Sequence, residues 1–144
     1  MNVSMEIIGQ GGLSDDFNDI AEMIRVKVEN SLVDAALLVH ESAVKSILAK
    51  GSGSRTVTRY NPKRQQLVSE PGNPPNSDMG TLVQSIQFEV DKDNLEAYVG
   101  TNLKYGLYLE IGTTSTKARP WLLPAFQKNR DQIIDLIREA LAVE

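Results

Sequence analysis

The stretch that decides the fold is DDFNDIAEMIRVKVENSLVDAALLVHESAVKSILAK, residues 15–50, which contains no glycine and no proline. Its apolar residues recur every three or four positions, which places them on one face of an α-helix. That face comprises Phe17, Ile20, Ala21, Ile24, Val28, Leu32, Ala35 and Val39. Ser14, Asp15 or Asp16 is expected to cap the helix, and Gly51 to end it. The sequence therefore predicts a helix of about 35 residues and about 50 Å.

The predicted helix is too long for the domain that would bury it. The chain has 144 residues, the size of one ordinary domain, and a compact domain of that size is about 40 Å across. The helix must bend, overhang or lie against something else. A second apolar stripe lies roughly opposite the first and comprises Met23, Val26, Val33, Leu37, Val44 and Leu48. A helix that is apolar on two faces lies between two layers, and either both belong to this chain or one comes from a neighbouring subunit.

Residues 51–77 are predicted to be a long, irregular and mobile loop, because they begin with glycine and serine and hold four of the six prolines. The loop carries one acidic residue, Glu70, and four basic ones, so its net charge is +3. The basic residues are Arg55, Arg59, Lys63 and Arg64. Such a loop can meet phosphates, or it can dock on an acidic neighbour such as the first half of the protein's own long helix. The net charge of −4 for the whole chain favours docking.

The remaining elements are shorter. SDMGTLVQSI, residues 77–86, is expected to be a short helix or turn capped by Ser77 or Asp78. Alternating apolar residues on either side of DKDN predict a β-hairpin at about residues 85–101. A single apolar stripe predicts a final helix at about residues 123–142, with Pro124 in its first turn. The predicted fold is a single α+β domain, with a long N-terminal helix packed on a small antiparallel β-sheet and a C-terminal amphipathic helix.

The composition offers little for catalysis. The chain has no cysteine and a single histidine, His40, which we expect to be solvated or at an interface. It contains no phosphate-binding loop, dinucleotide fingerprint or nucleophile elbow. We therefore predict no catalytic residue, no cofactor and no metal site, and a protein that is not an enzyme. No apolar run approaches the ~20 residues of a membrane span and no signal peptide is evident, so we expect a soluble protein made in the cytoplasm.

The stretch YGLYLEIGTTSTKARPWLLPAF, residues 105–126, places one carboxylate in apolar surroundings. Glu110 is expected to be half-buried and to need a partner. Either it pairs with Arg119 and pins the loop at residues 112–118, or it caps backbone N–H groups nearby. Gly112 can supply a positive φ after the apolar turn. Trp121 is either a core anchor or an interface anchor.

Three segments in order resemble a known family: PGNPPNSDMGTLVQSI, YVGTNLKYGLYLEIGTT and ARPWLLPAF, at residues 71–86, 98–114 and 118–126. Together they are similar to the tail-component, or head–tail joining, proteins of long-tailed bacteriophages and prophages. The chain departs from the family pattern at Met79, where threonine is common, and at Trp121, where phenylalanine is common. The matching positions are Gly80, Leu82, Ser85, Ile86, Gly100, Tyr105, Glu110, Gly112, Thr113, Pro120, Trp121, Pro124 and Ala125.

The resemblance implies a virion structural protein of the neck or tail top, which forms a homo-oligomeric ring, contacts other neck and tail proteins and helps to join head to tail. DNA would touch it only by passing through the ring, and no membrane is involved. The alternative is a nucleic-acid-binding module that uses residues 55–64. The expected subunit or partner interface is Met23, Val26, Val33, Leu37, Val44, Arg55, Arg59, Lys63, Arg64 and Trp121. The residues expected to structure the loops are Gly80, Tyr105, Glu110, Gly112, Thr113, Arg119, Pro120 and Pro124.

Overall fold

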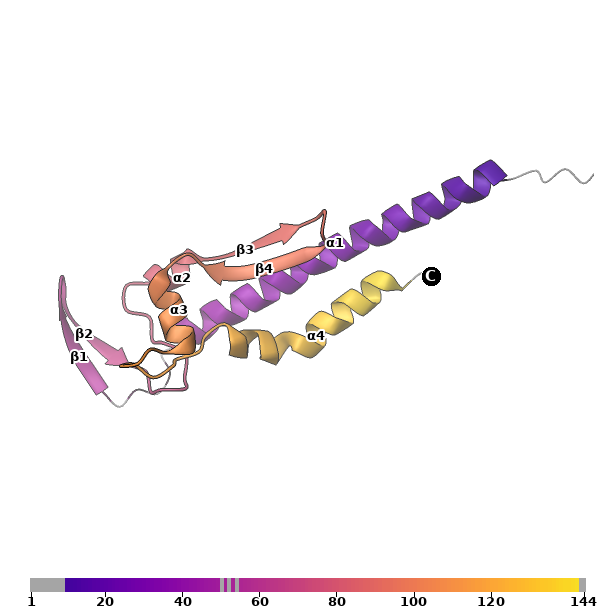
Figure 1. Cartoon of the computed structure of the whole chain (residues 1–144). Helices are drawn as coiled ribbons and strands as arrows, with labels where there is room; N and C mark the ends of the chain where they lie inside the picture. The colour runs from indigo at the N-terminus through magenta and orange to yellow at the C-terminus, as the bar shows by residue number, and fades with distance from the viewer. Residues whose placement is uncertain (1–9, 50, 52, 54, 143–144) are drawn as a thin grey trace, which may run out of the picture.

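The computed structural model describes residues 10–49, 51, 53 and 55–142, and it confirms the α+β class (Figure 1). The described residues begin with helix α1 (Gln10–Leu48) and continue through two hairpins and three further helices. The later elements are β1 (Arg55–Tyr60), β2 (Lys63–Val68), α2 (Thr81–Ser85), β3 (Ile86–Asp91), β4 (Glu96–Thr101), α3 (Lys104–Ile111) and α4 (Leu123–Leu141).

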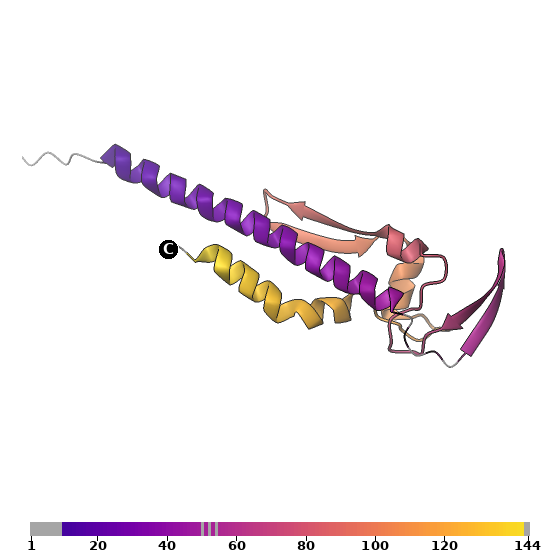
Figure 2. The same cartoon turned by 180° about the vertical axis from the view of Figure 1, so that it is seen from behind.

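Helix α1 is the spine of the molecule. Strands β3 and β4 pack along one side of its C-terminal half, and α4 packs along another (Figures 1 and 2). Small and branched residues of α1, namely Val39, Ala43 and Ile47, enter the core together with Leu82, Ile86, Trp121 and Ala125. Alanines on α1 let neighbouring elements approach closely, so a modest number of side chains forms a continuous core.

The start of α1 differs from the prediction. The helix begins at Gln10, before the expected caps at Ser14, Asp15 and Asp16. The glycines at 11 and 12 suggested a connector, but each glycine costs a helix only about 1 kcal/mol. Extending a long existing helix adds one hydrogen bond for each residue fixed, so it can continue through weak positions.

The predicted irregular loop at 51–77 is wrong over its first half. Residues 55–68 form an antiparallel hairpin, β1–β2, whose register runs from Arg55 opposite Val68 to Tyr60 opposite Lys63. The missed signal is the β-branched and aromatic content of RTVTRY, followed by an Asn-Pro turn. The structure therefore contains two two-stranded sheets instead of one small sheet.

The second hairpin matches the prediction. Strands β3 and β4 pair from Ile86 opposite Thr101 to Asp91 opposite Glu96. The turn is held by Asp91, whose Oδ1 accepts hydrogen bonds from the backbone N–H groups of Asp93 (2.9 Å) and Asn94 (3.1 Å). These bonds, with one from the Asn94 side chain, lower the pKa of Asp91 because they favour the charged carboxylate.

Candidate functional site

The first turns of α1 extend past the rest of the molecule, beyond both α4 and the β3–β4 turn (Figures 1 and 2). We call residues 14–23 the overhang; every one of them is exposed. At about 1.5 Å per residue the overhang is about 15 Å long. It carries Phe17, which is 65% exposed, with Ile20 and Met23. It also carries Asp15, Asp16, Asp19 and Glu22, and no basic residue. The overhang is therefore both apolar and acidic.

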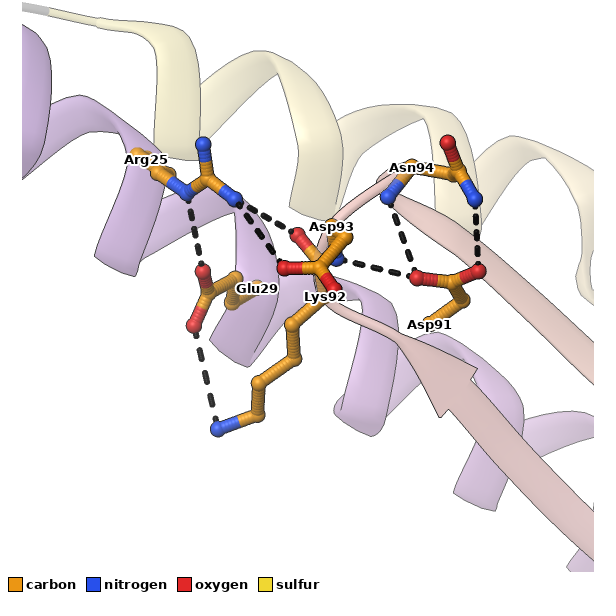
Figure 3. Close-up of polar contacts among 6 residues, drawn as sticks. All are labelled: Arg25, Glu29, Asp91, Lys92, Asp93 and Asn94. Carbon is orange, nitrogen blue, oxygen red and sulfur yellow. Dashed lines mark hydrogen bonds and ion pairs between the residues drawn. The ribbon is translucent and has the colours of Figure 1, made fainter.

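A polar network marks the point where the overhang meets the body (Figure 3). Arg25 donates from Nη2 to the backbone carbonyl of Lys92 (3.0 Å) and from Nε to Glu29 (3.3 Å). Glu29 also lies 3.8 Å from Nζ of Lys92, and Arg25 lies 3.9 Å from Asp93. The β3–β4 turn is thus fastened to α1 just where the overhang starts. These contacts mark the end of the packed body, and the described residues leave the apolar side chains of the overhang exposed.

The second apolar stripe of α1 is only partly covered by the chain. Met23, Val26 and Leu37 are exposed, at 45%, 45% and 40%. Val33 and Val44 are half-buried, and Val44 packs against the core. The first stripe also emerges at its N-terminal end, where Phe17 and Ile20 are exposed. The described chain therefore covers the second stripe only in places, since Leu37 and Leu48 are 40% and 53% exposed even in the C-terminal half of α1.

The opposite end of the molecule carries the basic hairpin, which we define as β1–β2, residues 55–68 (Figure 1). Arg55, Arg59 and Lys63 are exposed, whereas Arg64 is half-buried. Arg64 forms a two-pronged pair with Asp78, with Nε donating to Oδ1 at 2.7 Å. This arginine lowers the pKa of Asp78 through its hydrogen bond, and the carboxylate raises the pKa of Arg64. Asp78 thus holds the hairpin in place. It does not cap α2, although the sequence had suggested Ser77 or Asp78 for that role.

A cleft of about 350 Å³ separates the basic hairpin from α3 and the α2 region. Its lining includes Arg59, Gln66, Ser69, Tyr105 and Arg119. Arg119 donates from Nε to the backbone carbonyl of Ser69 (3.0 Å). The Ser69 side chain is buried, and within the described part of the chain its hydroxyl oxygen has no hydrogen-bond partner. The cleft thus combines two guanidinium groups with a buried hydroxyl that lacks a partner.

Helix α3 adds apolar surface to this end of the molecule. Leu107, Tyr108 and Ile111 are 56%, 51% and 67% exposed. Tyr105 is also exposed in part, and partial burial raises the pKa of its hydroxyl. An eight-residue helix that lies on the body with one side leaves its other sides in water. The exposed side chains of α3 are therefore available for contact with another molecule.

The predicted ion pair between Glu110 and Arg119 does not form. Glu110 instead accepts hydrogen bonds from the backbone N–H groups of Trp121 (2.8 Å), Leu122 (2.9 Å) and Leu123 (2.8 Å). These are the unpaired N–H groups at the start of α4, where a negative charge is also favoured by the helix dipole. Glu110 therefore plays the alternative role of a cap, supplied from another helix because the N-cap residue, Leu122, has no polar side chain.

The loop between α3 and α4 is closed by backbone geometry and hydroxyl groups. Gly112 has φ of +78°, and an added Cβ would lie 2.9 Å from the backbone nitrogen of Ala118. Thr113 accepts at Oγ1 from the N–H groups of Ser115 and Thr116. Pro120 is half-buried and Pro124 stands in the first turn of α4. Gly80, with φ of +78°, plays a similar part before α2.

Trp121 belongs to the core, so its inclusion in the predicted interface is wrong. It is 2% exposed, and its indole N–H donates to the backbone carbonyl of Gly106 at 3.0 Å. His40 is likewise internal: its Nε2 lies 3.2 Å from the Ile86 carbonyl, and its ring meets Phe88 edge-on at 5.8 Å. His40 thus joins α1 to β3, and Trp121 joins the segment just before α4 to α3. Their sequence context could not separate such a role from a surface role.

The described residues contain no group of three or more histidine, cysteine, aspartate or glutamate side chains placed to hold a metal ion. Among the same residues, no helix combines the length and the apolar character that crossing a membrane requires. What the arrangement offers chemically is contact: an acidic, apolar rod at one end, and a basic end with a cleft and an apolar helix at the other. The sequence favoured docking of the basic segment on an acidic neighbour such as the first half of the same chain's helix, but the structure places these two surfaces at opposite ends of the molecule (Figures 1 and 2).

Comparison with known proteins gave no relative for this chain. No protein-family model matches it, and neither the curated proteins nor the solved structures contain a significant match.

Proposed function

We propose that this chain is a structural subunit of a tailed-phage or prophage virion, which assembles as a ring at the neck or tail top and helps to join head to tail. The observation that carries the proposal is the overhang. Phe17, Ile20 and Met23 are 65%, 40% and 45% exposed, on a helix segment that extends past α4 and the β3–β4 turn (Figure 1). Apolar side chains gathered on one exposed segment mark a surface for contact with another molecule. A function by assembly supplies that contact.

The phage-like motif residues support a scaffold role. Glu110 caps α4, Gly112 permits the tight loop, and Trp121 fills the core. These positions shape one corner of the fold and converge on no reactive group. The proposal therefore assigns the chain no catalytic step and derives its action from contacts with other virion subunits.

The test is deletion of the coding sequence from the phage or prophage genome that carries it, followed by electron microscopy of the particles. We expect DNA-filled heads and separate tails, with joining restored by the intact gene supplied in trans. Normal joined particles after deletion would refute the proposal. Neighbouring genes for portal, capsid and tail-tube proteins are expected around it.

Nucleic-acid binding by the basic hairpin is the competing function. Arg55, Arg59 and Lys63 are exposed in a way that suits phosphate contact. Arg64, however, is engaged by Asp78, and the whole chain carries a net charge of −4. Salt-dependent DNA binding that disappears when these four residues become alanine would favour this function over assembly.

A further inference from the structure

We propose that copies of this chain associate head to tail: the overhang of one copy docks on the basic end of the next. The basic end is the basic hairpin, the exposed face of α3 and the cleft between them. This inference rests on the proposed function and names the partner and the two surfaces. The occupant of each basic end is a second copy of this chain.

Charge complementarity is the first reason. The overhang holds Asp15, Asp16, Asp19 and Glu22 and no basic residue. The basic hairpin holds Arg55, Arg59, Lys63 and Arg64 and no acidic residue, and of these only Arg64 has a carboxylate partner in the described chain. The two ends lie at opposite extremes of an elongated molecule (Figures 1 and 2), so one copy cannot bring them together. Two copies can.

Apolar complementarity is the second reason. The overhang presents Phe17, Ile20 and Met23, and the basic end presents Leu107, Tyr108 and Ile111, all exposed. An apolar centre with a charged rim is the usual anatomy of a protein interface. The opposite charges steer and orient the two surfaces, while burial of the apolar side chains supplies most of the affinity.

The cleft is the third reason. Arg59 and Arg119 line it together with Asp78, whose carboxylate is already paired with Arg64. A carboxylate from the neighbour's overhang would meet the two guanidinium groups there.

The two surfaces differ from each other, so the contact is heterologous. Repetition of a heterologous contact generates a ring if the rotation closes and an open filament if it does not. Each copy uses both of its ends, which accounts for an overhang that the other described residues leave exposed. A face-to-face dimer would instead pair the overhang with another overhang, and their acidic side chains would repel each other.

The direct test is cross-linking between copies, which the absence of natural cysteines makes specific. One variant carries Ala21→Cys in the overhang, and another carries Leu107→Cys on α3. A mixture treated with a short bismaleimide is expected to give the mixed dimer. Ala21→Cys alone is expected to give none. The matched control Asp131→Cys, on the exposed face of α4, is expected to cross-link to neither. Overhang-to-overhang products, or no product at high protein concentration and on assembled particles, would overturn the proposal.

Charge reversal provides a second test with an internal rescue. Lysine at Asp15, Asp16 and Asp19, or glutamate at Arg55, Arg59 and Lys63, is expected to abolish self-association seen by sedimentation. The protein with all six changes, and an equimolar mixture of the two triple variants, are expected to associate again. Both triple variants should keep the circular dichroism and thermal midpoint of the parent, because the altered residues are exposed. Loss of association without rescue would contradict the pairing.

The two proposals fail separately. If the cross-links and the rescue appear but deletion leaves particles intact, the chain self-associates as inferred and the virion function is wrong. If deletion separates heads from tails while Ala21→Cys cross-links only to a different virion protein, the function stands and the head-to-tail contact is wrong.

Discussion

At the scale of single residues, the corner between α3 and α4 shows how few side chains position two helices. The Glu110 carboxylate satisfies three backbone N–H groups at the start of α4, and the Trp121 indole returns a hydrogen bond to the Gly106 carbonyl on α3. In both interactions the donor lies at or just before the start of α4 and the acceptor lies on α3. Together they hold the start of α4 against α3.

Removing the Glu110 carboxylate should destabilise the fold. Glu110→Ala leaves three N–H groups at a partly buried helix start without their acceptor, which we expect to lower the free energy of unfolding by about 1–3 kcal/mol. Glu139→Ala, which removes a carboxylate from the exposed face of the same helix, is the control and should change it little. Denaturant unfolding measures the free energy of unfolding of both variants. Equal losses would show that the cap contributes nothing specific.

Gly106 is predicted to tolerate no larger side chain. An added Cβ would lie 2.6 Å from Cγ2 of Thr101 and 3.1 Å from Cδ1 of Leu82. Gly106→Ala should therefore cost about 1–3 kcal/mol of unfolding free energy through overpacking. Gly100→Ala is the matched control, because nothing lies within 4 Å of its added Cβ. Thermal unfolding should show a lower midpoint for the first variant only.

At the scale of elements, the two hairpins depend on different kinds of support. Hairpin β3–β4 packs on α1 through Ile86, which is 4% exposed. The basic hairpin has mainly polar attachments, including the Arg64–Asp78 pair and the Asn76 side chain, which donates to the Leu67 carbonyl at 3.0 Å. An isolated two-stranded hairpin is marginally stable. The basic hairpin is accordingly the element that we expect to open first.

Acid should release the basic hairpin. Because Arg64 lowers the pKa of Asp78 in the folded protein, the pair stabilises the hairpin above the ordinary carboxyl value of 3.8. That stabilisation is lost as the pH falls below 3.8 and through the lowered pKa. The protection factors of the amides in residues 55–68, measured by NMR hydrogen exchange and corrected for the intrinsic pH dependence, should therefore fall in acid. Asp78→Asn should exchange quickly already at neutral pH and lose this acid-dependent step; a normal acid response in that variant would exclude the mechanism.

The two halves of α1 should respond differently to the same substitution. Ile47 is 1% exposed in the core, so Ile47→Ala should cost about 2–5 kcal/mol of unfolding free energy. Ile20 lies in the overhang, and Ile20→Ala should change it by less than about 0.5 kcal/mol in the monomer. Denaturant unfolding compares the two. A large cost at Ile20 would mean that the chain's own residues cover the overhang.

At the scale of the whole molecule, shape and charge act together. An acidic, apolar end and a basic end are held apart by a single long helix, which separates them too far for either to neutralise the other within one copy. The proposed attraction between the two ends can then act only between copies. Such a molecule is suited to stepwise assembly.

Self-association should weaken with salt. Interactions between exposed charges are screened over about 8 Å at physiological ionic strength and over about 3 Å at 1 M salt. We expect the association constant to fall at least about tenfold from 50 mM to 500 mM sodium chloride, as for other interfaces with charged rims. Analytical ultracentrifugation makes the measurement. Stronger association in high salt would mean that burial of apolar surface alone holds the copies together.

The sequence by itself determined the elements with strong periodicity: the helix over residues 15–50, the hairpin at 85–101 and the helix at 123–142. Each has a repeated apolar spacing that is set by backbone geometry and needs no distant partner. It also anticipated that α1 exceeds the body, since helix length and domain size follow from residue number alone. The basic hairpin was missed because its strand pattern is short, only half apolar and interrupted by positively charged residues.

Only the tertiary structure decided which groups meet. Sequence spacing allowed Glu110 to bind Arg119 or to cap a helix, and it allowed Trp121 to lie inside or outside. These choices depend on where α3, α4 and the Ser69 carbonyl come to lie in space, which is fixed by packing among residues far apart in the chain. The same holds for the overhang and the basic end: their compositions are written in the sequence, but their placement at opposite ends of one rod is a consequence of the fold.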